Sequence, residues 1–216
     1  MTYRVEHRNG ETGLAVQVKP KAIGRTLGEF AMDFSSNQDS QTQFNLTFGL
    51  LWSPVNSNGG EMRGLLTVGD EPGLVGEWYQ PLTPGGKYFS NLGAGYQQDL
   101  YQFGDGLDSV VAEYIRNEFF IKPAIGRAFG NWGQVSLGLD IATGDFERRI
   151  GSPALPEEKY KIRNAVLDFK IDTLDSLYLP REGILLDVSL VESVGSWGST
   201  DSFSQANLEF IGARPF

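Results

Sequence analysis

Apolar and polar residues alternate along most of this chain, in segments of about ten residues that end in turns rich in Gly, Asn, Asp or Pro. Residues 44–52 show the pattern clearly: even-numbered positions are Phe, Leu, Phe, Leu and Trp, and most odd-numbered positions between them are Asn, Thr and Gly. Successive side chains of a strand point to opposite faces, so this segment has one apolar and one polar face. A tilted strand of about 9–11 residues is long enough to cross a bilayer.

The same alternation predicts about ten strands of this kind, and no helix-like segment separates them. Many amphipathic strands in succession are typical of an antiparallel up-and-down transmembrane β-barrel. They also suit a soluble all-β barrel or sandwich. The predicted strands cover 25–35, 43–53, two segments on either side of the turn 69–73, then 88–103, 112–128, 133–143, 160–173, 183–193 and 204–213.

A more charged hairpin is predicted before these strands. Residues 3–7 and 14–19 alternate on either side of Asn9-Gly10, and Asn-Gly between alternating segments is a strong hairpin signal. Pro20 and Gly24 mark the junction between this hairpin and the first barrel strand. We therefore expect two domains, a hairpin module over 1–22 and a barrel over 23–216.

If the strands run up and down, every second connection lies at the same end of the sheet. One predicted set of turns is short, and each has an aromatic residue close by, which suggests an aromatic girdle of Trp52, Tyr79, Trp132 and Tyr178. The other set contains the longest and most polar loop, 143–159. Short turns at one end and longer loops at the other are typical of outer-membrane barrels. The short set is 53–61, 81–87, 130–133 and 178–183, and the other is 35–42, 69–73, 104–109, 143–159 and 194–204.

Composition narrows the function classes. The chain has 216 residues, a net charge of −9, 27 Gly and no Cys. The negative charge argues against a nucleic-acid partner, and the absence of Cys excludes disulfides and thiolate metal sites. A mean hydropathy of −0.24 excludes a helical membrane protein. It does not exclude a barrel, because half of each strand faces a polar lumen.

The segment Met1–His7 has neither the apolar stretch nor the cleavage site of a signal peptide. A barrel must be exported, so the barrel interpretation leads us to expect that the natural N-terminus lies upstream. A chain complete as written would favour the soluble alternative.

One segment resembles a known family. Residues 172–187 read Asp-Thr-Leu-Asp-Ser-Leu-Tyr-Leu-Pro-Arg-Glu-Gly-Ile-Leu-Leu-Asp. This resembles the strand–turn–strand signature of BamA-superfamily barrels (bacterial surface antigen domains), in which a short periplasmic turn joins two strands. The positions that fit the signature are Asp172, Leu174, Asp175, Tyr178, Pro180 and Gly183.

Weaker similarities extend the resemblance over nearly the whole chain. Residues 73–82 look like the fourth-strand region of these barrels, and the 3–19 hairpin is similar to the end of a POTRA domain. Residues 88–91 and 129–133 look most like the barrels behind patatin-like phospholipases, the type V secretion group. Such barrels usually have about sixteen strands. We therefore expect a partial barrel of about ten strands, truncated at its C-terminal end and preceded by a POTRA-like module.

Catalytic chemistry is poorly represented. The only histidine, His7, lies in the predicted hairpin, and no second histidine could complete a metal or acid–base pair. No Gly-x-Ser-x-Gly motif occurs. We therefore expect no catalytic residue, no metal and no cofactor, and predict that this chain is not itself an enzyme. A patatin-like hydrolase domain would lie upstream.

Charged residues gather around one predicted hairpin. Asp168, Lys170, Asp187 and Arg181 suggest a polar lumen wall against which a lid loop or a passing chain packs. The alternative is hydrated lumen residues beside a proline-containing turn.

The resemblance implies a barrel in the Gram-negative outer membrane that exports or tethers an upstream passenger domain. Its partners would be outer-membrane lipid and that passenger, with the barrel assembly machinery as a further candidate and no nucleic acid. A soluble all-β ligand-binding module is the alternative. An integral outer-membrane lipid hydrolase is disfavoured by the isolated His7.

Overall fold

The computed structural model describes residues 2–8, 11–17, 24–36, 42–104, 110–176 and 178–214. Ten strands form one antiparallel sheet, and their order in the sheet is their order in the chain. The predicted all-β, up-and-down architecture is thus confirmed. The strands are β3 (Thr26–Ser36), β4 (Thr42–Trp52), β5 (Glu61–Gly69), β6 (Gly73–Pro81), β7 (Tyr88–Gly104), β8 (Val110–Ala128), β9 (Gly133–Ile150), β10 (Glu158–Asp172), β11 (Gly183–Ser193) and β12 (Phe203–Ala213).

A separate two-stranded sheet comes first. Among the described strands, β1 (Thr2–Arg8) and β2 (Glu11–Gln17) pair only with each other, with Tyr3 opposite Val16 and Arg8 opposite Glu11. This register is that of the predicted hairpin. The predicted turn residues Asn9 and Gly10 and the predicted domain boundary near residue 22 lie outside the described residues.

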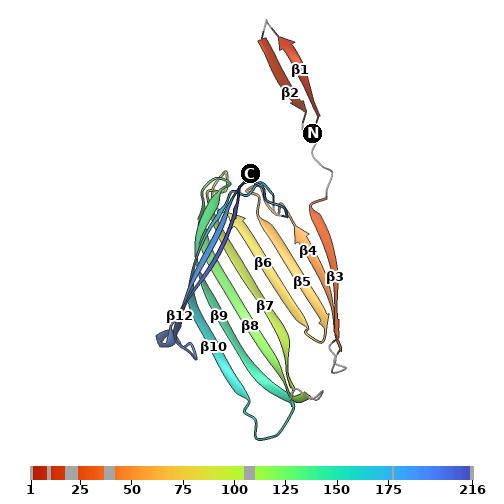
Figure 1. The fold of residues 1–216 in the computed structure, drawn as a ribbon, viewed down its shortest axis with the longest axis vertical. Coiled ribbons are helices and arrows are strands. Elements are labelled where there is room, and N and C mark those ends of the chain that lie inside the picture. The colour runs from red at the N-terminus through yellow and green to blue at the C-terminus, as the bar shows by residue number, and fades with distance from the viewer. Residues whose placement is uncertain are drawn as a thin grey trace.

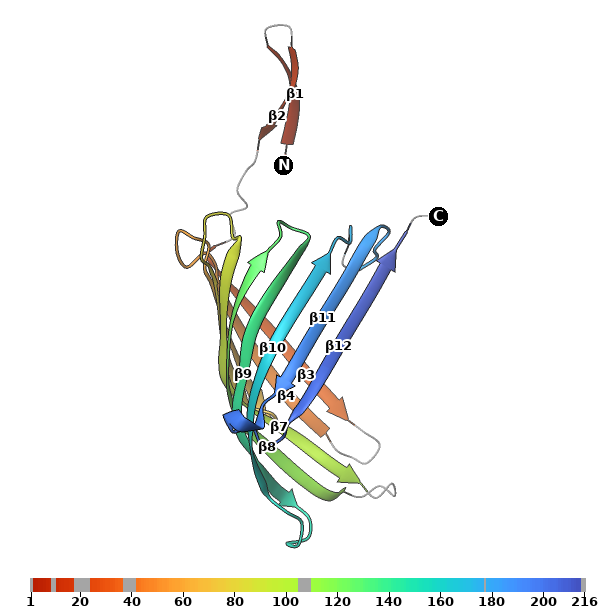
Figure 2. The same cartoon turned by 90° about the vertical axis from the view of Figure 1, so that its left-hand side faces the viewer.

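The ten-stranded sheet curls strongly, so that it has a convex outward face and a concave inward face (Figures 1 and 2). Its connections alternate between two ends. One end, called here the turn side, carries residues 53–60, 82–87, 129–132 and 173–182. The other, called here the extension side, carries 70–72, 151–157 and 194–202. The described members of the two predicted turn sets therefore lie at opposite ends, as expected. The predicted turn 104–109 and most of 35–42 lie outside the described residues.

The predicted difference in loop length is not what separates these ends. The connection 173–182 on the turn side is longer than 151–157 on the extension side. Strands β7 to β10 are instead 15–19 residues long, against 9–11 residues for the other strands of this sheet. These four continue past their neighbours on the extension side (Figure 1).

The predicted long loop 143–159 is therefore wrong in its bounds. Strand β9 runs to Ile150 and β10 begins at Glu158, with Phe146 opposite Glu158. The polar residues of 143–150 suggested a loop because they break the apolar alternation. These residues nonetheless form backbone pairs with β8 and β10. Because they lie beyond the outward apolar rows, their strand does not need the apolar alternation on which the prediction relied.

Helical structure is limited to one short 3₁₀ turn, Gly195–Trp197, within the described residues. No helix in that part of the chain is both long and apolar enough to cross a membrane.

Candidate membrane-facing surface and lumen

The outward face of the sheet is built from the apolar positions of each strand, which the register brings into continuous rows. Phe30 of β3 lies opposite Phe48 of β4, and Phe48 lies opposite Leu66 of β5. At the other end of the sheet, Leu167 of β10 lies opposite Leu190 of β11. Cross-strand pairs of large apolar side chains stabilise a sheet, and here they link all ten strands.

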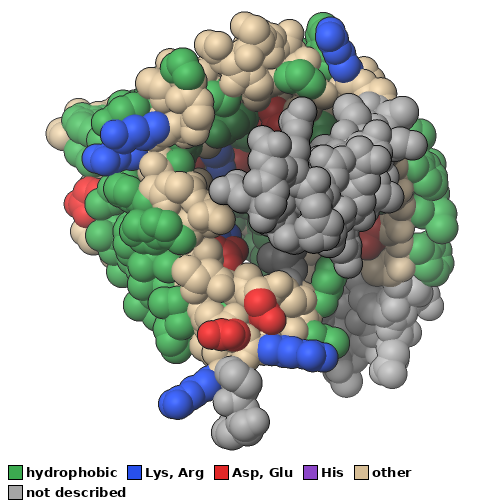
Figure 3. Space-filling model, turned by 90° about the horizontal axis from the view of Figure 1, so that it is seen from above, with side chains coloured by type: hydrophobic (Ala, Val, Ile, Leu, Met, Phe, Trp, Pro, Cys, Tyr) green, Lys and Arg blue, Asp and Glu red, His purple; other side chains and the backbone are tan. Residues whose placement is uncertain are grey.

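These apolar side chains are open to the surroundings rather than packed in a core. Phe30 is 64% exposed, Phe119 61% and Leu208 72%. The end-on view shows apolar side chains around the outside of the curled sheet (Figure 3). Monomeric soluble proteins rarely expose contiguous apolar patches beyond a few hundred Å². An apolar surface of this extent is therefore expected to lie against apolar surroundings and not against water.

Aromatic residues lie where this face meets the turn side. Trp52 and Trp78 face outward on either side of Met62, and Trp132 stacks on Phe129 with ring centroids 5.4 Å apart. Of the four aromatic residues predicted for a girdle, Trp52 and Trp132 lie here, and Tyr178 is 93% exposed in the 173–182 connection.

The fourth, Tyr79, points the other way. It shares the inward face with Asn91 and packs on the buried ring of Phe89, with centroids 5.7 Å apart. Its neighbour Trp78 takes the outward position. An error of one residue exchanges the two faces of a strand, because the side-chain period is two.

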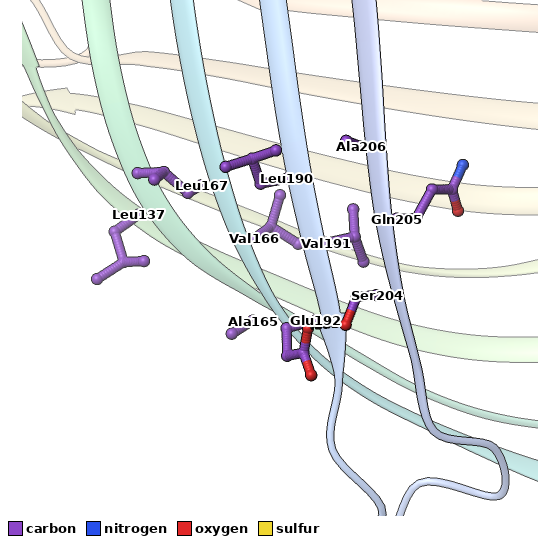
Figure 4. Close-up of a pocket in the computed structure, with 10 residues that line it drawn as sticks. All are labelled: Leu137, Ala165, Val166, Leu167, Leu190, Val191, Glu192, Ser204, Gln205 and Ala206. Carbon is purple, nitrogen blue, oxygen red and sulfur yellow. Dashed lines mark hydrogen bonds between the residues drawn. The ribbon is translucent and has the colours of Figure 1, made fainter.

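Small residues leave grooves in the outward face. One groove of about 410 Å³ lies over β9 to β12, where Ala165 and Ala206 stand among Leu137, Leu167 and Leu190. Figure 4 shows Glu192 and Ser204 together at one end of it, and the hydroxyl of Ser204 donates a hydrogen bond to the Glu192 carboxylate. The rest of the lining is apolar apart from Gln205.

The inward face carries paired charges. Two nitrogens of Arg116 donate to the same carboxylate oxygen of Asp99, at 2.9 and 2.6 Å. Farther along the sheet, Lys122 lies 3.5 Å from Asp140, and Arg63 lies 3.1 Å from Glu29. Charged side chains on this face can remain hydrated if the face borders water. Facing hydrocarbon instead would carry a large desolvation cost.

Part of the inward network depends on a close approach that only glycine allows. Tyr160 of β10 donates a hydrogen bond of 2.7 Å to Glu118 of β8, although β9 lies between these strands. The intervening residue is Gly144, and the Tyr160 ring occupies the space in which a Cβ at residue 144 would lie. Glu118 is thus buried and hydrogen-bonded.

The predicted lumen cluster is brought together only in part. Lys170 and Asp187 lie on the inward face, opposite each other, with Nζ 3.9 Å from the carboxylate. Asp168 shares that face, opposite Ser136 and Ser189. Arg181 is not part of this group, because it lies in the 173–182 connection with an exposed side chain.

The sequence did not point to the larger network of Asp99, Arg116, Glu118 and Tyr160. The available signal was Arg116 and Glu118, two charged residues that share one face of the predicted strand. Recognising their partners required the register of β7 and β10, which single-strand patterns do not provide.

The signature turn is organised around one carboxylate. Asp175 accepts hydrogen bonds from the backbone N–H groups of Arg181 (2.8 Å) and Glu182 (3.1 Å). These donors lower the pKa of the Asp175 carboxyl below its usual value, because they stabilise the ionised form. Gly183 closes the turn with φ +109°, and a Cβ there would clash with the carbonyl of Thr173. Two signature positions, Asp175 and Gly183, thus have a clear structural reason.

The only histidine lies in the first hairpin, far along the chain from the paired serine hydroxyls near the end of β11. His7 lies in β1 opposite Thr12. The hydroxyls of Ser193 and Ser199 lie 2.9 Å apart, with a backbone carbonyl of Asp201 as a further partner. No group of three or more His, Cys, Asp or Glu residues that could bind a metal occurs among the described residues.

The sheet has two free edges among the described residues. Strand β3 pairs only with β4, and β12 pairs only with β11. The sheet therefore curls without closing (Figure 2).

Sequence comparisons identify no relatives, since no family model and no curated protein matches this chain. Its structure is similar to the crystal structure of BamA from Haemophilus ducreyi lacking POTRA domains 1–3, with a TM-score of 0.63 and 13% sequence identity. The similarity covers 86% of this chain and 42% of that one. The chain thus has the fold of part of a BamA-like barrel and spans less than half of that structure's length.

Proposed function

We propose that this chain provides most of the strands of a BamA-like β-barrel in the Gram-negative outer membrane. The observation that carries the proposal is the outward apolar face, which continues across all ten strands of the sheet. The fold similarity supports the same assignment.

The distribution of polarity favours a membrane barrel over a soluble ligand-binding module. A soluble all-β domain buries the apolar face of its sheet and exposes the polar one. Here the apolar face is convex and exposed, and the concave face carries ion pairs such as Asp99 with Arg116. Lipid outside and water inside satisfy both faces.

The work we propose is the export or tethering of an upstream passenger domain. The 88–91 and 129–133 segments support a passenger of the patatin-like phospholipase kind, in a type V secretion arrangement. The β1–β2 hairpin would be the end of a POTRA-like module. Such work is conformational, so this chain needs no cofactor and no catalytic residue of its own. Lipid, the passenger and the barrel assembly machinery are its proposed partners.

Arginine substitutions on the two faces of one strand test the membrane assignment. Leu186 faces outward between Ile171 and Phe210, whereas Ser189 faces inward between Asp168 and Asn207. Leu186→Arg in the full-length protein should cost about 2–4 kcal/mol if it lies near the bilayer midplane. Leu167→Arg, on the same outward row as Leu190, should behave alike.

Ser189→Arg is the matched control and should cost much less, because its charge enters the polar lumen. The measurement is the amount of folded protein in purified outer membranes. Equal losses for Leu186→Arg and Ser189→Arg would contradict the assignment of the two faces.

A further inference from the structure

Two cations lie around one aromatic ring at the edge where the outward face meets the turn side. The Nζ of Lys87 and the guanidinium carbon of Arg127 each lie 5.8 Å from the ring centroid of Tyr88. Arg127 also lies 5.2 Å from the centroid of Phe129, whose ring stacks on Trp132. We call Lys87, Tyr88, Arg127, Phe129 and Trp132 the basic–aromatic cluster.

Backbone pairing fixes the two cations near each other. Tyr88 lies opposite Arg127 in the ladder of β7 and β8, and the backbone N–H of Ala128 donates to the carbonyl of Lys87. Because both cationic groups lie 5.8 Å from the centroid of the Tyr88 ring, the distance between them is at most twice that value. Neither has an ion-pair partner within the described part of the chain. Among the described residues, the cluster therefore offers two positive charges without an ion-pair partner at one place.

An apolar groove leads away from this cluster along the outward face. It has a volume of about 410 Å³ and begins at Leu82, Tyr88 and Arg127. It continues over β8 to β10, between side chains that include Ile125, Val135, Leu137 and Leu167. A cationic end joined to an apolar groove is complementary to a ligand with an anionic head and a hydrocarbon chain.

We propose that the basic–aromatic cluster and this groove bind one anionic glycerophospholipid from the leaflet on the turn side. Lys87 and Arg127 contact the phosphate, Tyr88 and Trp132 lie at headgroup level, and one acyl chain occupies the groove. Aromatic side chains gather at this depth because one end is apolar and the other wet. The inference rests on the proposed function, since the groove meets lipid only if the outward face lies in a bilayer.

Charge-removing variants of the full-length protein test the site. We would measure, by native mass spectrometry, how many phosphatidylglycerol and phosphatidylcholine molecules with identical acyl chains the detergent-solubilised protein retains. Each Lys or Arg near a lipid surface contributes a roughly fivefold preference for an anionic lipid. The double variant Lys87→Gln/Arg127→Gln should therefore lose about a twenty-five-fold preference for phosphatidylglycerol.

The double variant Lys159→Gln/Lys161→Gln is the matched control. It removes two positive charges from the same face of β10, toward the extension side. The control should keep the preference, and added inorganic phosphate at the lipid concentration should not abolish it. Equal preference in wild type and Lys87→Gln/Arg127→Gln, or displacement by phosphate alone, would overturn the proposed lipid site.

Heat-modifiable migration on cold SDS gels separates this result from the fate of the proposed function. Closed barrels resist SDS until they are boiled, so the shift reports folding independently of lipid choice. A wild-type protein that shows the shift without lipid preference overturns the lipid site alone. A wild-type protein that neither shows the shift nor enters bilayers overturns both proposals.

Discussion

Single residues of this sheet are constrained mainly by which face they occupy and by how closely neighbouring backbones approach. Trp78 and Tyr79 are adjacent aromatic residues, yet one faces outward beside Met62 and the other packs inward on Phe89. Gly144 has a different role, because it leaves room for the Tyr160 ring to reach Glu118. The alternation of apolar and polar residues thus determines which face of the sheet each side chain occupies. A glycine such as Gly144 determines where a side chain can reach over one strand to contact the next.

At the residue scale, we predict that Gly183→Ala destabilises the signature turn. Its φ of +109° is unfavourable for any residue with a Cβ, and that Cβ would clash with the carbonyl of Thr173. The expected loss is about 1–3 kcal/mol, measured as a lower urea midpoint of the full-length protein in micelles.

Gly64→Ala is the control for this substitution. Gly64 faces outward between Leu50 and Gly76, and no atom lies within 4 Å of the position of an added Cβ. It should change stability by about 0.5 kcal/mol or less, or stabilise slightly. A Gly183→Ala variant as stable as Gly64→Ala would show that the turn does not require this conformation.

At the scale of elements, the most informative feature is the extension of β7 to β10 beyond the neighbouring strands. Their additional residues carry polar and charged side chains, including Asp99, Arg116 and Arg148. Polar side chains are expensive in hydrocarbon, so this part of the sheet suits the aqueous phase beyond one membrane surface. The extension, and not the lengths of the loops, distinguishes the two ends of the sheet.

Protease accessibility tests this polarity. A protease site inserted between Pro153 and Ala154, at the tip beyond β9, should be cut in intact cells, because we expect the extension side to face outward from the cell. A site between Ser57 and Asn58, on the turn side, should be cut only after the outer membrane is opened. The reverse pattern would mean that the sheet is inserted the other way.

Most strands could be predicted because each carries its own alternation. The residues of β11, 183–193, and the apolar face of β4 follow directly from a period of two. The ends of β9 and β10 could not, since residues 144–150 lie beyond the outward apolar rows and do not continue their alternation. Cross-strand contacts such as Tyr160 with Glu118 also escaped prediction, because register is set between strands and not within one.

At the scale of the whole molecule, the two free edges decide how the sheet can exist in a membrane. Residues Phe203–Gly212 of β12 are exposed throughout, and Leu208 and Phe210 are 72% and 61% exposed. Unpaired backbone groups in lipid cost several kcal/mol each. A long apolar edge in water pairs with other chains and aggregates. In a membrane, β3 and β12 would therefore each need a pairing partner, which a further strand or the opposite edge could supply.

We therefore predict that residues 1–216 expressed alone do not form a stable closed barrel in detergent. The polypeptide should aggregate and show no heat-modifiable shift on cold SDS gels. Fusing on a segment with about six further strands, which would bring the sheet to the size usual for BamA-like barrels, should restore the shift. A monomeric shift from residues 1–216 alone would show that β3 and β12 can close on each other.

The central claim is that the even-numbered residues of β11 face lipid and the odd-numbered ones face a water-filled lumen. The chain has no native cysteine, so single cysteines at 184–190 of the full-length protein can carry a nitroxide label without background. We predict that oxygen, which concentrates in hydrocarbon, relaxes labels at Leu186, Val188 and Leu190, and that a water-soluble nickel chelate relaxes labels at Asp187 and Ser189. Uniform accessibility to the chelate along 184–190, or the opposite alternation, would contradict the membrane-barrel account.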